Sequence, residues 1–242
     1  MSRTKIIEGE TLAYYSGGDL ARIRSMTSQF PSRLLTVLVC VALSTLPAVA
    51  QVARIGALSV AGTSDELKRA VEDKGYRVTL DDGWTAEFWF AKQLKTTTKD
   101  ASGSALYPEL TNGEFVGVVS LPKGMTDFRG QAIPAGVYTL RYQLLPQDGN
   151  HLGVAPNPDF LLAIPAASDL NPAQSYLYKK LVALSAQSTG TNHPAVIALN
   201  AAGEPGSVGK DEQNLTVLTI AIPASSDATE KLGIVVKGTA TQ

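Results

Sequence analysis

The feature that most restricts the fold is a regular alternation of side-chain types in residues 137–145. Apolar or aromatic side chains occupy every second position: Tyr138, Leu140, Tyr142 and Leu144. The positions between them are polar: Thr139, Arg141 and Gln143. Successive residues of a β-strand point to opposite faces, so this segment predicts an antiparallel strand with one buried and one half-exposed face.

Similar runs recur along the chain and predict a mainly β fold. Strands are expected at 76–80, 84–94, 115–121, 160–164, 195–199, 215–222 and 232–237. Turn signals separate several of them, among them Asn112-Gly113 and Pro134-Ala135-Gly136. Roughly eight short strands at this spacing predict an antiparallel β-sandwich of the jelly-roll or Ig-like kind. A closed barrel with a ligand cavity is the alternative.

Two short helices are expected beside the strands. Thr63 is a predicted N-cap with Glu66 three residues later, and Lys74-Gly75 is a typical helix end. Asn171 followed by Pro172 predicts the start of a second helix. Its apolar stripe would consist of Leu177, Leu181 and Leu184.

Residues 26–50 have the pattern of a secretory signal peptide. Arg33 precedes an apolar run over 34–46, and Ala48-Val49-Ala50 supplies an Ala-x-Ala cleavage site. The run is shorter than the ~20 apolar residues that a membrane-spanning helix needs. We therefore expect cleavage after Ala50, a secreted or periplasmic location, no stable membrane span in the mature form, and a single domain over 51–242. Residues 1–25 would then be an extension upstream of the true start at Met26.

Charge and cysteine content exclude several functional classes. Lys and Arg total 21 against 22 Asp and Glu, which lacks the basic surplus of a general nucleic-acid binder. The single cysteine, Cys40, lies inside the expected signal peptide. A mature chain without cysteine has no disulfide, zinc–thiolate site or cysteine nucleophile. Phosphate-binding glycine loops, the G-x-S-x-G motif and the H-E-x-x-H motif are also absent from the sequence.

One polar cluster is a candidate binding site. It consists of Asp148, Asn150, His151 and Asp159, with His193 distant in sequence. Two imidazoles and one or two carboxylates suit a divalent cation if they converge in space. The favoured interpretation is structural, because Asp148-Gly149-Asn150 is a turn signal within a loop expected over 146–159. No cofactor is predicted.

Aromatic residues gather in residues 84–90. An exposed Trp84 or Trp89 could stack on a sugar, as in a carbohydrate-binding module. The favoured interpretation is a core strand, because Trp84, Ala86, Phe88 and Phe90 alternate onto one face. Trp89 then falls on the other face, where a second layer or a helix would cover it.

Several segments carry a resemblance to known proteins. They are 127–131 (DFRGQ), 134–142 (PAGVYTLRY), 148–156 (DGNHLGVAP) and 191–194 (TNHP). Together they resemble an uncharacterised family of exported bacterial β-sandwich proteins of unknown function, over roughly residues 55–238. The resemblance implies a secreted β-sandwich and carries no activity.

The sequence thus favours a binding or interaction module over an enzyme. Its partner would be a small molecule, a glycan or a protein. A divalent-metal-dependent hydrolase using His151 and His193 is the alternative.

Overall fold

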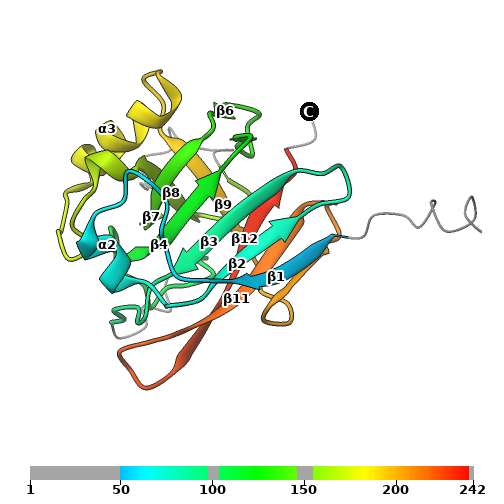
Figure 1. The fold of residues 1–242 in the computed structure, drawn as a ribbon, viewed down its shortest axis with the longest axis horizontal. Helices are drawn as coiled ribbons and strands as arrows, with labels where there is room; N and C mark the ends of the chain where they lie inside the picture. Colours follow the sequence, from blue (N-terminus) through cyan, green and yellow to red (C-terminus); the bar gives the residue numbers. More distant parts are fainter. Residues whose placement is uncertain (1–49, 98–103, 146–154, 240–242) are drawn as a thin grey trace, which may run out of the picture. The chain divides into compact units, whose positions relative to one another are not determined.

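Ten strands form one antiparallel sheet that curls until its two edge strands meet (Figure 1). The computed structural model describes residues 50–97, 104–145 and 155–239. In spatial order the strands are β1 (Gln51–Ile55), β2 (Gly75–Thr79), β3 (Thr85–Phe90), β4 (Phe115–Leu121), β7 (Gly136–Leu144), β8 (Asp159–Pro165), β9 (Ala195–Asn200), β12 (Thr229–Lys237), β11 (Thr216–Pro223) and β10 (Ser207–Lys210). The edge strands β1 and β10 contact each other, but no ladder joins them, although every residue of both is described.

The inner face of the curled sheet encloses the main hydrophobic core. Buried side chains from strands on both sides of the enclosure contribute to it, including Val78, Phe88, Leu140, Ile220 and Ile234. The mainly antiparallel β fold with two short helices is confirmed. Its two layers belong to one nearly closed sheet, an arrangement between the expected sandwich and the alternative closed barrel.

The first described helix, α2 (Asp65–Ala70), lies against the outer side of the sheet near β3 (Figure 1). Its N-cap is Ser64, whose hydroxyl accepts a hydrogen bond from the Leu67 amide at 3.1 Å. The predicted cap, Thr63, is wrong by one residue, because its hydroxyl donates instead to the Val60 carbonyl. Leu67 is fully buried and joins the main core cluster, to which Trp89 also belongs.

The second helix, α3 (Tyr178–Thr189), begins later than the sequence predicted. The Asn171 side chain accepts a hydrogen bond from the Ala173 amide, so it closes a local turn and caps no helix. Leu177 precedes the helix with extended backbone and is 83% exposed, so it is not part of the apolar stripe. The other two predicted positions, Leu181 and Leu184, are buried and pack against β8 and β9.

The outer face of β7 is buried, where the sequence predicted a half-exposed face. Thr139, Arg141 and Gln143 are at most 2% exposed. The segment after the short 3-10 helix η1 (Ala166–Ser168) supplies Asp169, which accepts hydrogen bonds of 2.7 and 2.8 Å from Arg141. The same guanidinium donates to the backbone carbonyls of Gly113, Asn171 and Gln174. Polar residues on this face therefore form an internal network and do not face solvent.

A small hairpin stands apart from the main sheet. It pairs β5 (Met125–Thr126) with β6 (Ala132–Ile133). In the part of the chain that the structure describes, no helix is both long enough and apolar enough to cross a membrane.

Candidate functional site

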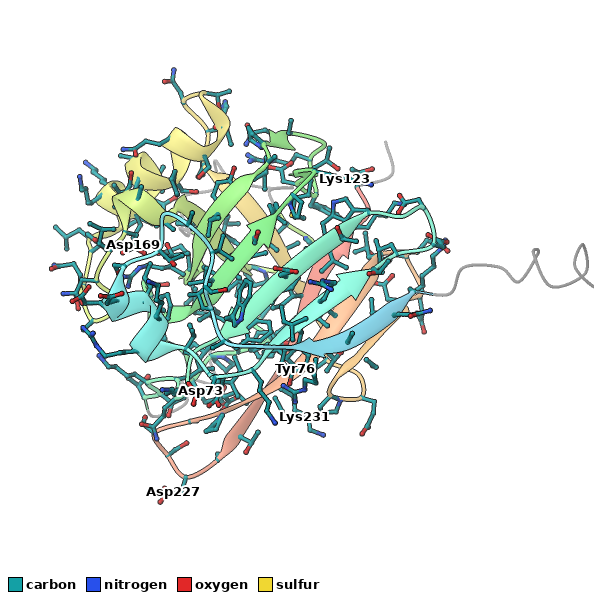
Figure 2. The ribbon with its side chains drawn as sticks, viewed as in Figure 1. Asp73, Tyr76, Lys123, Asp169, Asp227 and Lys231 are labelled. Carbon is teal, nitrogen blue, oxygen red and sulfur yellow. The ribbon has the colours of Figure 1, made fainter. Side chains whose placement is uncertain are left out.

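An open groove of about 830 Å³ lies at one end of the curled sheet. We call it the terminal groove. The antiparallel strand order brings the ends of β1, β3 and β11 and the start of β2 to this side. Its lining consists of Arg54, Ile55, Gly56, Glu72, Asp73, Lys74, Tyr76, Phe90, Ala91, Ala221, Ile222 and Pro223. Figure 2 labels Asp73 and Tyr76 in this region, together with Lys231 of β12.

Aromatic side chains form the floor of the terminal groove. The rings of Tyr76 and Phe90 meet edge to face, with centroids 5.8 Å apart and an interplanar angle of 62°. Phe90 is 3% exposed and also stacks on Phe88 of the core. Arg54 places its guanidinium carbon 3.8 Å above the centre of the Tyr76 ring. A cation over an aromatic face is attracted by the ring quadrupole, so this contact holds Arg54 over the floor.

Strand alternation explains why these side chains meet. Tyr76 pairs with Phe88 across β2 and β3, and Arg54 pairs with Tyr76 across β1 and β2. Residues directly opposite each other share a face, and Phe88 faces the core. Arg54 and Tyr76 therefore point toward the inside of the sheet at its open end.

Charged side chains form the rim. Glu72, Asp73 and Lys74 lie in the short connection between α2 and β2. The Glu72 amide donates to the Phe90 carbonyl at 2.9 Å, which fixes this connection over the end of β3. Asp73 lies 3.8 Å from the Lys92 ammonium.

The two tryptophans considered as sugar-stacking residues lie elsewhere. Trp89 is 3% exposed, and its indole N–H donates to the Gly56 carbonyl at 2.9 Å. Its ring therefore has no exposed face on which a sugar could stack. Trp89 is covered, as the core-strand interpretation expected. Trp84 is half-buried, and its indole N–H donates to the Gly124 carbonyl. Both indoles therefore tie loops to the sheet.

Asp159 is the best described residue of the predicted polar cluster. It is fully buried at the start of β8, and its Oδ2 accepts a hydrogen bond from the Tyr107 amide at 2.9 Å. The Tyr142 hydroxyl lies 3.4 Å from the same oxygen and 3.0 Å from the Tyr107 carbonyl. Oδ1 is buried and has no hydrogen-bond partner among the described residues. The carboxylate therefore lies inside the fold beside two tyrosines.

The two tyrosines beside Asp159 are held in the neutral form. Burial, followed by the charge of Asp159, raises the pKa of Tyr107 to about 12. Burial is also the main cause that raises the pKa of Tyr142, again with Asp159 as the next contribution. The Tyr107 hydroxyl donates to the Asn200 carbonyl and accepts from the Gly233 amide. This cluster joins β8, β9 and β12 and serves packing.

His193 does not lie near Asp159. It is exposed in the turn between α3 and β9, where its carbonyl accepts hydrogen bonds from Thr189 and Thr191. Ala163 pairs with Ala195, and Asp159 lies four positions before Ala163, or about 13 Å along β8. His193 lies beyond Ala195 at the opposite end of this strand pair, so the two residues cannot share one metal ion.

The other predicted residues, Asp148, Asn150 and His151, lie outside the described residues. Within the described ranges, no three His, Cys, Asp or Glu side chains are grouped to hold a metal ion.

Two of the segments that carried the family resemblance meet in space. Asp127, fully buried, accepts hydrogen bonds from the Arg129 and Gln131 amides and from the Arg129 guanidinium. The side chains of Arg129 and Gln131 both donate to the Pro194 carbonyl, at 3.2 and 3.0 Å. This arrangement fastens the β5–β6 hairpin to the turn that precedes β9, which is a structural role.

Sequence reasoning missed the residues that form the terminal groove. Arg54 lies in a strand that it did not predict, and Ala221 is unremarkable by residue type. Strand β1 is only five residues long and does not alternate between polar and apolar residue types, so the sequence carried little signal for it. Searches against protein-family models, curated proteins and solved structures found no match to this chain.

Proposed function

We propose that the protein is a binding module and that the terminal groove holds its ligand. The observation that carries this proposal is the aromatic floor of Tyr76 and Phe90 beneath an open space of about 830 Å³. Ligand sites of small molecules and peptides are concave, largely apolar and of about 300–1,000 Å³, with a few polar groups that fix orientation. Arg54 and the backbone at the strand ends are the polar groups here.

The chemistry of the lining favours binding over catalysis. The two carboxylates, Glu72 and Asp73, are exposed on the rim and do not face each other across a buried cleft. The described residues of the lining include no His, Cys or Ser that could act as a base or nucleophile. As part of the proposal, the module acts outside the cytoplasm, in line with the signal-peptide pattern of residues 26–50.

The test follows the NMR chemical shifts of the backbone amides in the isotope-labelled full chain as small probe molecules are added. The probes are acetylated amino-acid amides, common monosaccharides, and small aromatic and aliphatic carboxylates. We expect at least one class to shift the amides around Arg54, Tyr76 and Ala221, and Arg54→Gln to weaken that binding at least threefold.

Arg77→Gln is the matched control. Arg77 lies on β2 opposite Ala53, points to the outer face and pairs with Glu87 at 2.7 Å. It has the same chemistry one strand away from Arg54, on the other side of the sheet, so the proposal requires its substitution to leave binding unchanged. Shifts that cluster away from the groove, or equal affinities for Arg54→Gln and the wild type, would refute the proposal.

A further inference from the structure

The terminal groove coincides with a gap in the sheet. Strand β10 pairs with β11 only over Thr216–Thr219, whereas β11 continues to Pro223. Among the described residues, the β10 side of β11 then has no paired segment until Pro223 and Ala224, where Leu94 bridges to β11. Strand β1 contacts β10 and lines the same groove through Arg54 and Ile55. Between the start of β10 and the contact with Leu94, no described strand lies between β11 and β1, and the groove occupies this position.

On the β11 side of the gap, the backbone of Ala221 points into the groove. The Ala224 amide donates to the Ala228 carbonyl, which sets the phase of the β11–β12 ladder. Bonded pairs alternate in an antiparallel ladder, so Ile220 and Ile222 bond to β12 and Ala221 points the other way.

The neighbouring outward groups of β11 are already used. The Thr219 carbonyl accepts from the Gly206 amide, and the Pro223 carbonyl accepts from the Leu94 amide. Among the described residues, nothing pairs with the N–H or C=O of Ala221.

On the β1 side of the gap, the backbone N–H and C=O of Arg54 also point into the groove. The Leu80 amide donates to the Trp84 carbonyl, so Tyr76 and Val78 bond to β3 while Gly75 and Arg77 bond to β1. Their partners on β1 are Ile55 and Ala53. The N–H and C=O of Arg54 therefore point away from β2, and no described residue pairs with them.

We propose that the terminal groove binds an extended peptide from another protein, which inserts as a strand between β1 and β11. This inference rests on the proposed function and names its ligand class. All neighbours in the sheet are antiparallel, so β1 and β11 run in the same direction (Figure 1). An inserted strand runs antiparallel to both, as a continuation of β10. Strand addition of this kind satisfies open edges and takes specificity from alternate side chains.

The two edges fit one peptide strand in phase. Consecutive residues of a strand direct their backbone groups to opposite sides and their side chains to opposite faces. One peptide residue pairs with Ala221, whose exposed side chain lies on the outer face, while its neighbour pairs with Arg54, whose side chain points inward over Tyr76. Two adjacent peptide residues can therefore pair with Ala221 and Arg54 at the same time, without a register shift.

Charge and apolarity define the peptide. Its inward residue faces Tyr76 and Phe90 and is therefore apolar. Its outward residue lies on the face of Lys231, the exposed cross-strand neighbour of Ala221 (Figure 2). Within the described residues, Arg54, Lys74 and Lys231 form no ion pair with a carboxylate. Of the two rim carboxylates, Asp73 pairs with Lys92, and Glu72 offsets one of these three positive charges. The surplus of cations favours an acidic residue next to the apolar one.

The experiment selects ligands from a displayed library of random ten-residue peptides, using the full chain as bait. We expect enrichment of sequences with adjacent apolar and acidic residues, and shifts at the Arg54 and Ala221 amides when the synthesised peptides are added. Single N-methylation of the peptide backbone should weaken binding at least tenfold at two adjacent positions and have little effect near the ends.

The key variant is Ala221→Pro, which removes the outward N–H. Proline is tolerated on a strand edge whose N–H faces solvent, so the fold should persist. Binding of the selected peptides should fall at least tenfold. The matched control, Ala221→Thr, adds similar volume on the outer face, keeps the N–H and should retain binding. If Ala221→Pro does not fold, the N-methyl series decides alone.

Three results would overturn the inference: no enrichment of peptides, equal binding by Ala221→Pro and the wild type, or tolerance of N-methylation at every position. Shifts at Arg54 and Ala221 that depend on protein concentration alone would identify a second copy of the chain as the occupant and would also overturn it. The proposed function fails separately, because it requires small probes to shift the groove residues whether or not any peptide binds.

Discussion

Gly75, at the start of β2 beside the terminal groove, allows the Trp89 indole to pack closely against the backbone. A Cβ atom at this position would lie 2.7 Å from the Phe88 carbonyl oxygen and 2.7 Å from the Trp89 indole nitrogen. The first contact is with backbone and cannot move away easily. The second would push the indole from the Gly56 carbonyl to which it donates. Close approach of Trp89 therefore requires glycine at the start of β2.

We expect Gly75→Ala to lower the free energy of unfolding by about 1–3 kcal/mol, the range for overpacking a filled site. Urea unfolding followed by tryptophan fluorescence measures it, since the chain has two tryptophans. Gly56→Ala is the control, because a Cβ there meets nothing within 4 Å and should change stability by less than about 0.5 kcal/mol. Equal effects of the two substitutions would contradict the packing argument.

At the scale of elements, the ion pair of Arg141 and Asp169 holds the segment before α3 against β7. Both residues are at most 1% exposed and are joined by two hydrogen bonds. Asp169→Asn leaves the guanidinium buried without its counter-charge, so the expected loss of stability is about 3–5 kcal/mol. Glu87→Gln, which breaks the exposed pair with Arg77, should cost less than about 1 kcal/mol. A loss at Asp169 as small as that at Glu87 would show that the pair does not hold the segment.

The same elements show what could be predicted from sequence. Period-two alternation located β7 and the apolar run located β8, because burial of a strand face leaves a direct mark on composition. The alternation could not show that Arg141 is buried. A charged residue at an alternate strand position predicts a solvent-exposed face, and only the fold shows that Asp169 lies beside it. The edge strands β1 and β10 were missed because short strands with one free edge carry little pattern. The groove lies between β1 and the end of β11, so the candidate site was missed together with β1.

At the scale of the whole molecule, the sheet is antiparallel throughout and closes except at one seam. Each strand from β2 to β11 in the spatial order has a hydrogen-bonded neighbour on both sides, whereas β1 and β10 have one each. An open edge normally invites association with other chains, and natural sheets protect it. Here contact between β1 and β10 protects part of the seam, and the part left open is the terminal groove.

Amide hydrogen exchange can test the seam directly. Within β1, the amides of Ala53 and Ile55 bond to β2, while those of Val52 and Arg54 point to the seam. Exchange at Val52 and Arg54 should therefore be at least tenfold faster, and Ala221 should likewise exchange faster than Ile220 and Ile222. In β8, paired on both sides, the consecutive amides of Leu161 and Leu162 should both be protected, which serves as the internal control. Equal protection of all residues in β1 would mean that the sheet is fully closed, and then no slot would exist for an added strand.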